Sequence, residues 1–146
     1  MTEVQAQSPP RLLEPVTGDA ADLVLGRIAE HVPAGEDILI RVFADLDDDR
    51  AYSTRWVVVT EKRVLVVPVA DTPVQEVAVS ELAVVRADAL VGGAQLTLEC
   101  THRPTLTVPY TGTQSVKFSE VARGLEQLRK GETFRVNSKL DRIRCE

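Results

Sequence analysis

The chain has 146 residues, of which 44% are hydrophobic and 27% charged, a composition typical of one globular domain and not of a disordered chain. Its formal net charge of −5 argues against the basic surface that non-specific nucleic-acid binding needs, so we expect no nucleic-acid partner. No apolar run approaches the ~20 residues of a membrane-spanning helix. The charge is unevenly spread, with acidic residues concentrated in residues 1–50 and basic residues in residues 117–146.

The N-terminal part of the chain predicts a leader followed by a helix. Residues 1–16 are rich in proline and glutamine and are expected to form a flexible leader. Apolar residues then recur at helical spacing from Asp19 to Val32, where Asp19 is a possible N-cap and Pro33 and Gly35 end the pattern. A helix this short and amphipathic needs a surface to lie against.

The middle of the chain has the period of β-strands. Alternating apolar residues, separated by short polar turns, predict about seven strands. Connections this short leave no room for parallel crossovers, so the strands should be antiparallel. The expected strands are residues 38–44, 52–60, 64–69, 74–78, 83–89, 94–100 and 105–110.

A second amphipathic helix is predicted over residues 115–130, with Thr113 as a plausible N-cap and Gly131 at the C′ position. Residues 132–146 read as a tail or linker. The fold prediction is therefore one mainly-β domain over residues 17–131. It is an antiparallel barrel or sandwich of about seven strands, with an N-terminal helix and a C-terminal helix that caps the open end.

Catalytic motifs are missing from the sequence. It contains no phosphate-binding loop of the Gly-Lys type and no G-x-S-x-G elbow. The two histidines, His31 and His102, fall at a helix end and in a turn, and Cys100 alternates in phase with Leu98, as a core residue would. We therefore predict that this chain is not an enzyme and has no catalytic, cofactor-binding or metal-binding residue.

The acidic run from Asp45 to Asp49 looks like a calcium loop but lacks its key positions. Arg50 stands where the sixth residue would be glycine, and Trp56 where the twelfth would be glutamate. A hairpin turn is the better interpretation, with a weak surface cation site as the alternative.

Basic residues give the one candidate binding site. Lys62 and Arg63 fall in a strand-connecting turn and Arg55 on the preceding strand, which is a pattern that an anionic lipid or a protein partner can use. The basic residues of the C-terminal tail could likewise contact an anionic lipid or a protein partner, and the alternative is a solvated linker.

Three segments resemble the pleckstrin-homology-like domain that begins certain bacterial ABC exporters. Residues 45–68, DLDDDRAYSTRWVVVTEKRVLVVP, resemble its D-L-D…G-R-Y…R-W-L-V-L-T-D-R-R-L-L-V segment. Residues 84–98, VVRADALVGGAQLTL, look like its V-R-V-E-E-L-V-G-G-G-R-L-E hairpin, and residues 118–131, FSEVARGLEQLRKG, are similar to its helix F-A-x-V-A-R-x-L-E-x-L-x-K-G. The resemblance covers about residues 20–145.

This sequence departs from the family pattern at three places. The glycine of the first hairpin turn is replaced by Asp49-Arg50, Pro68 interrupts a strand near its end, and Cys145 stands without the second cysteine of the family's R-C-P-x-C-G motif.

The resemblance implies a non-catalytic regulatory or docking domain at the N-terminus of an ATP-driven exporter, on the cytoplasmic side of the membrane. The parent protein would bind ATP and Mg²⁺, and this chain would contact its other domains or a protein partner through strand edges and the N-terminal helix. One alternative is a free-standing peripheral adaptor that binds anionic lipid or a protein. Another is an enzyme or carrier with a small-molecule pocket inside the barrel.

Overall fold

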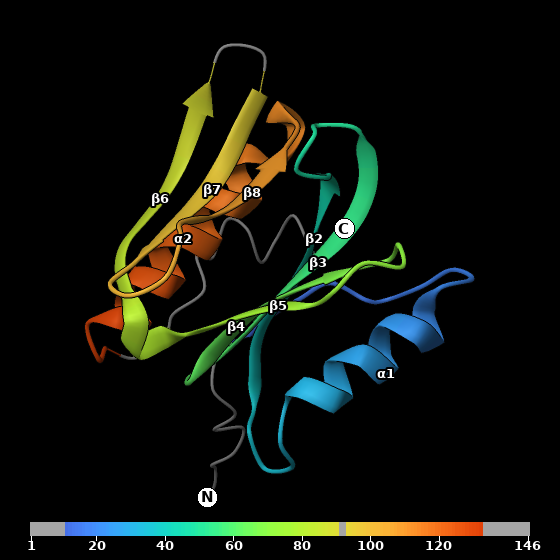
Figure 1. Cartoon of the computed structure of the whole chain (residues 1–146), viewed down its shortest axis with the longest axis horizontal. Coiled ribbons are helices and arrows are strands. Elements are labelled where there is room, and N and C mark those ends of the chain that lie inside the picture. Colours follow the sequence, from blue (N-terminus) through green and yellow to red (C-terminus); the bar gives the residue numbers. More distant parts are fainter. Residues whose placement is uncertain (1–10, 91–92, 133–146) are drawn as a thin grey trace, which may run out of the picture.

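The computed structural model describes residues 11–90 and 93–132, and the predicted tail, Cys145 and most of the predicted leader lie outside them. Eight described strands form two sheets, one ordered β1-β2-β3-β4-β5 and the other β6-β7-β8 (Figure 1). All neighbouring strands are antiparallel except β1 and β2. The bounds are β1 Leu12–Leu13, β2 Ile38–Leu46, β3 Tyr52–Thr60, β4 Arg63–Pro68, β5 Gln75–Ala78, β6 Leu82–Leu90, β7 Gly93–Cys100 and β8 Leu106–Tyr110.

The seven predicted strands are present as β2 to β8, and the mainly-β prediction is confirmed. The barrel alternative is wrong, because the two sheets do not close. A 3-10 turn (η1, Val79–Glu81) leads from β5 into β6, and within the described residues no ladder joins β8 to β2. Asp45 of β2 contacts the residue that follows β8. Its side chain accepts hydrogen bonds from the backbone N–H and the hydroxyl of Thr111 at 2.9 and 2.5 Å.

The strand β1 was not predicted. Leu12 and Leu13 fell within the expected leader, but they pair in parallel with Ile40 and Arg41, and Leu12 is completely buried. Glu14 extends the pairing by donating its N–H to the carbonyl oxygen of Arg41 at 2.7 Å. Two residues are too few to show a period of two, so no pattern marks this strand.

The C-terminal helix α2 (Ser115–Arg129) packs along the second sheet and buries one face in the core that the two sheets share. Phe118, Val121 and Leu125 on that face are fully buried. The ring of Phe118 stacks on Tyr110 of β8, with 4.2 Å between the ring centroids. The core thus connects the last strand to the last helix.

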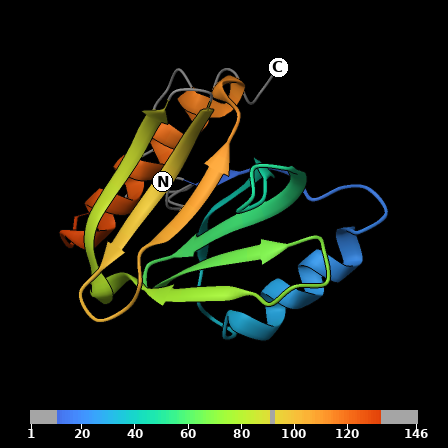
Figure 2. The same ribbon diagram turned by 45° about the horizontal axis from the view of Figure 1, so that its top comes forward.

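The N-terminal helix α1 (Ala21–His31) packs its apolar face on the first sheet, as its amphipathic pattern predicted. Val24 and Ile28 pack on Trp56 and Leu65, on the face of the first sheet that points away from the shared core. Figure 2 shows α1 beside the first sheet and α2 beside the second. The first sheet is therefore buried on both faces, which explains its continuous valine runs in place of strict alternation.

The helix ends were predicted in part. Gly131 has the left-handed φ of +80° that the C′ position favours, and its N–H donates to the Leu128 carbonyl oxygen. The two proposed N-caps are wrong: α1 starts after Ala20 and α2 after Gln114, and neither has a side-chain cap. A 3-10 turn (η2, Gly112–Gln114) precedes α2 and displaces the expected cap by one residue.

Within the described residues, no helix is both long and apolar enough to span a bilayer.

Candidate functional site

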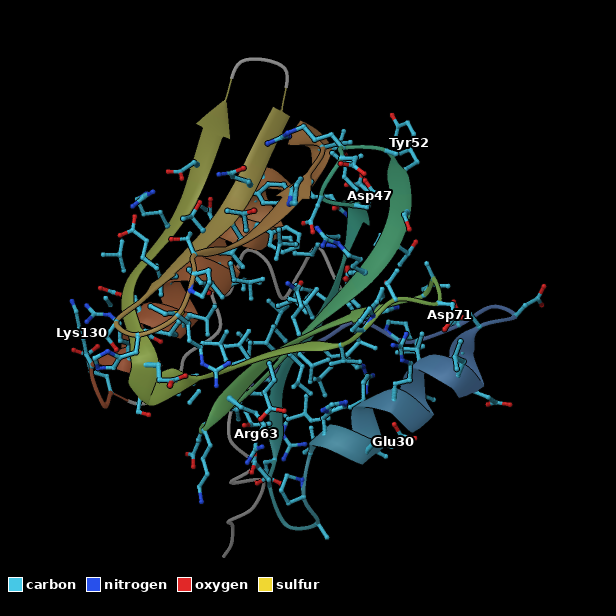
Figure 3. All side chains as sticks on the ribbon, viewed as in Figure 1. Glu30, Asp47, Tyr52, Arg63, Asp71 and Lys130 are labelled. Carbon is cyan, nitrogen blue, oxygen red and sulfur yellow. The ribbon has the colours of Figure 1, made fainter. Side chains whose placement is uncertain are left out.

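The three predicted site residues lie in two separate places. Arg55 pairs with Pro68 across β3 and β4, and Pro68 is five residues along β4 from Arg63. At ~3.3 Å per strand residue, about 16 Å of sheet separates the two arginines. In Figure 3, Arg63 and Asp47, a residue of the loop beside Arg55, lie at opposite ends of the first sheet.

Arg63 is held in an ion-pair network at one end of the sheet. Its Nε and Nη2 donate to the Glu36 carboxylate at 2.7 and 3.1 Å, and its Nη1 donates to Glu76 at 3.0 Å. Burial raises the pKa of Glu36, but the hydrogen bonds from Thr60 and Arg63 outweigh it and lower that pKa overall. The charge of Arg63 is therefore balanced by two carboxylates.

Lys62 is exposed beside this network and lies over a hollow of about 400 Å³. The hollow is lined by three acidic side chains and two basic ones: Glu36, Asp37 and Glu61 against Lys62 and Arg63. An anionic headgroup needs a gathered positive charge, which this arrangement does not supply.

Arg55 lies at the other end of the sheet and is 6% exposed. Its Nε donates to the Leu46 carbonyl oxygen at 3.2 Å, and its Nη1 donates to Asp48 at 3.0 Å. Its Nη2 is buried and has no hydrogen-bond partner. Such an unpaired buried donor is uncommon in folded proteins.

Arg55 lines a cleft of about 420 Å³ between the β2–β3 loop and the β4–β5 loop. We call it the loop cleft. One wall is acidic and the other is largely apolar, and the lining residues are Asp47, Asp48, Asp49, Ser53, Arg55, Val66, Pro68, Ala70, Thr72, Pro73 and Gln75. In Figure 3, Asp47 and Asp71 mark the two loops.

The acidic wall is the run that resembled a calcium loop. The Asp47 carboxylate accepts hydrogen bonds from the backbone N–H groups of Asp49 and Ala51 at 2.9 and 3.0 Å. Arg50 has a left-handed φ of +63°, a conformation that glycine adopts more readily than other residues. Within the described residues, no group of three or more His, Cys, Asp or Glu side chains is arranged to hold a metal ion.

The opposite wall is held by α1. Arg27 donates from Nη1 to the carbonyl oxygens of Pro68 at 2.8 Å and Ala70 at 3.1 Å, and from Nη2 to that of Thr72. The sequence showed Arg27 only as part of the helix's polar face. Its acceptors are backbone groups more than forty residues away, so no side-chain pattern identifies them.

Lys117 is a second residue that the sequence did not single out. Its Nζ donates to Glu14 at 3.1 Å and to the Phe43 carbonyl oxygen at 2.7 Å, and lies 4.0 Å from the centroid of the Phe43 ring. Burial lowers the pKa of Lys117, and Glu14 opposes that shift. This contact joins α2 to the segment just after β1.

The edge of the second sheet is open. Within the described residues β6 pairs with β7 alone, so the backbone groups on its other side have no partner strand. We call this side of β6 the free edge; in Figure 1, β6 is the outermost strand of its sheet. Ala83, Arg86 and Ala89 are exposed along it.

The two histidines and Cys100 do not line the loop cleft. His31 lies 3.4 Å from Glu76 through Nδ1, and His102 is exposed in a turn. Cys100 is half-buried against the shared core, and burial raises the pKa of its thiol.

Comparisons with known proteins add no assignment: no family model matches the chain, and the search of curated proteins finds no match.

Proposed function

We propose that this chain is a pleckstrin-homology-like, non-catalytic docking domain of an ATP-driven membrane exporter, placed on the cytoplasmic side of the membrane. The fold supports the first part of the proposal. Seven antiparallel strands (β2 to β8) in two sheets, followed by a helix packed on the shared core, agree with the sandwich form of the expected domain.

The observation that carries the docking role is the free edge of β6. An unpaired strand nine residues long presents backbone donors and acceptors that an extended segment can pair with. The other edge strands among the described residues are shorter: β8 has five residues, of which Pro109 has no backbone N–H, β5 has four, and β1 has two. We propose that an extended segment of the exporter adds to the sheet at β6.

The lipid-adaptor alternative has less support. Arg63 is neutralised by Glu36 and Glu76, and Arg55 is buried against Asp48. Of the three predicted contact residues, Lys62 alone is exposed. We expect vesicles of anionic lipid to co-sediment little of the chain even at low salt, where electrostatic attraction is strongest.

Site-specific photo-crosslinking in cells tests the docking role. A photoreactive benzophenone residue is placed at Ala83 or Ala89 on the free edge, and at Ala34, an exposed alanine in the loop before β2, as the matched control. We expect both edge positions, but not the control, to crosslink to an exporter subunit identified by mass spectrometry. Equal crosslinking from all three positions, or capture of a protein that is not a transporter, would overturn the proposal.

The non-catalytic part is tested separately with an ATPase assay on the purified chain. We expect no turnover above a buffer blank, and steady hydrolysis that co-purifies with the chain would contradict it.

A further inference from the structure

The strand β6 carries two opposite charges that lie one residue apart on the same face of its sheet. From Val84 to Leu90 it pairs with β7 in regular register, so alternate side chains point to the same face. Arg86 and Asp88 share the outer face, whereas Val85 packs on the shared core from the inner face. This stretch contains no proline and no lysine, the residues that commonly prevent an edge strand from pairing.

Ala87 lies between the two charges, and this position determines how a second β6 could pair. In an antiparallel pair with Ala87 opposite Ala87, Arg86 of each copy lies directly opposite Asp88 of the other. Registers that place Arg86 opposite Arg86, or Asp88 opposite Asp88, bring like charges together and destabilise the pair. The charges therefore favour one register, in which β6 is complementary to itself.

Both charged side chains can take a further partner. Arg86 is 46% exposed and Asp88 is 28% exposed. The Nε and Nη1 of Arg86 donate to Asp88 and Glu99, but its Nη2 makes no hydrogen bond among the described residues. The carboxylate of Asp88 accepts from Thr97 at 3.1 Å and, with two oxygens, has acceptor sites to spare.

The edge beside these charges is accessible. The helix α2 packs on β6 from the inner face, yet Ala83 and Ala89 are exposed. In Figure 1, β6 is the outermost strand of its sheet. A second strand can therefore approach the free edge along the stretch that carries the two charges.

We propose that the extended segment that pairs with the free edge is β6 of a second copy of this chain, in a symmetric antiparallel pair centred on Ala87. This inference rests on the proposed docking at β6 and names its partner. The second sheets of the two copies then form one continuous sheet, and Arg86 of each copy pairs with Asp88 of the other. A symmetric contact of this kind closes on itself and stops at two copies.

The pair is expected to be weak. Pairing along a stretch as short as Val84–Leu90 buries less than the ~1,200 Å² of a stable interface. The chain is therefore a monomer with an open edge at micromolar concentration and pairs as its concentration approaches millimolar.

Sedimentation equilibrium and ¹⁵N NMR of the whole chain, from micromolar to millimolar concentration, test the inference. We expect a monomer–dimer equilibrium, with concentration-dependent shifts centred on residues 83–90. A monomer at every concentration, or shifts centred on another surface, would overturn it.

Two charge variants and their mixture test the register. Asp88→Arg and Arg86→Asp each place like charges opposite one another in the proposed pair. We expect each variant alone to associate ~10-fold more weakly than the unmodified chain, because symmetry turns two attractive pairs into two repulsive ones. In a mixture of the two variants opposite charges face each other again, so association should return. A mixture that associates no better than either variant alone would contradict the register.

The matched control is Glu61→Arg, which changes the net charge by the same amount as Asp88→Arg at an exposed position in the turn between β3 and β4. We expect Glu61→Arg to leave the self-association unchanged. An equal loss in Glu61→Arg and Asp88→Arg would be an effect of net charge and would contradict pairing at β6.

The docking role and the second copy as its partner fail in different ways. If the chain stays monomeric while Ala83 and Ala89 crosslink to another part of an exporter, the second copy is not the partner and docking at β6 stands. If the outward amides of β6 are protected in the dilute monomer, both proposals are overturned.

Discussion

The two sheets of this molecule differ in how they are covered. The first sheet is buried on both faces, by the shared core on one side and by Val24 and Ile28 of α1 on the other. The second sheet is covered on one face only, and its edge strand β6 has no outer partner among the described residues. The first sheet is therefore enclosed between two layers, whereas the second leaves the outer backbone groups of β6 without a partner strand.

The largest expected effect comes from the face of the first sheet that α1 covers. Trp56 is 5% exposed and contacts Phe43, with 5.7 Å between the ring centroids. We expect Trp56→Ala to lower the free energy of unfolding by about 3–5 kcal/mol, because it leaves a cavity under α1. Gln95→Ala, on the second sheet, removes side-chain hydrogen bonds with Arg50 and Thr97 and should lower it by about 1 kcal/mol. Urea unfolding compares the two, and equal losses would contradict the difference between the sheets.

A smaller effect is expected where α1 holds the β4–β5 loop. Arg27→Ala removes three hydrogen bonds from a charged donor to carbonyl oxygens of that loop. We expect a loss of about 2 kcal/mol in the free energy of unfolding. Glu30→Ala, at an exposed position on the same helix, is the control and should be close to neutral. If Arg27→Ala lowers the free energy of unfolding no more than Glu30→Ala does, α1 does not hold the β4–β5 loop.

The ion-pair network at the other end of the first sheet predicts a dependence on pH. The folded state lowers the pKa of Glu36 below its ordinary value of 4.5, because the bonds from Thr60 and Arg63 outweigh its burial. The stabilisation is therefore present above the unfolded pKa and is lost as the pH falls through the folded pKa. We expect Glu36→Gln to weaken the fall in urea midpoint between neutral and acidic pH, and an unchanged pH profile would contradict this assignment.

The smallest effect is expected at Arg50, whose φ of +63° strains any side chain but whose guanidinium reaches the Ala94 carbonyl oxygen at 3.4 Å. Arg50→Gly loses the contact but relieves the backbone, whereas Arg50→Ala loses the contact and keeps the strain. We expect the glycine variant to be more stable than the alanine variant by about 1 kcal/mol. Thermal unfolding of the pair measures this, and equal stability would exclude the left-handed conformation.

The comparison also shows what the sequence could predict. Alternation or short apolar runs between polar turns predicted β2 to β8, and the helical periods predicted α1 and α2. The parallel strand β1 was missed, since Leu12 and Leu13 are too few to form a pattern. Arg27 and Lys117 were missed because their partners are backbone carbonyl oxygens or come from distant parts of the chain.

The candidate site shows the same limit. Arg55, Lys62 and Arg63 are close in the sequence and basic, which suggested one positive surface. The fold puts Arg55 at one end of the sheet and balances Arg63 with two carboxylates from other segments. A basic run in a sequence therefore predicts charge along the chain, but the long-range ion pairs decide the charge of the surface.

Amide hydrogen exchange of the isolated chain tests the free edge of β6 most directly. Within β6, the N–H groups that face β7 should be protected, while the alternate groups that face outward should exchange as fast as loop amides. In β7, which has a neighbour on both sides, successive amides should all be protected. Uniform protection along β6 would show that its outer side is already paired and would contradict docking at this edge.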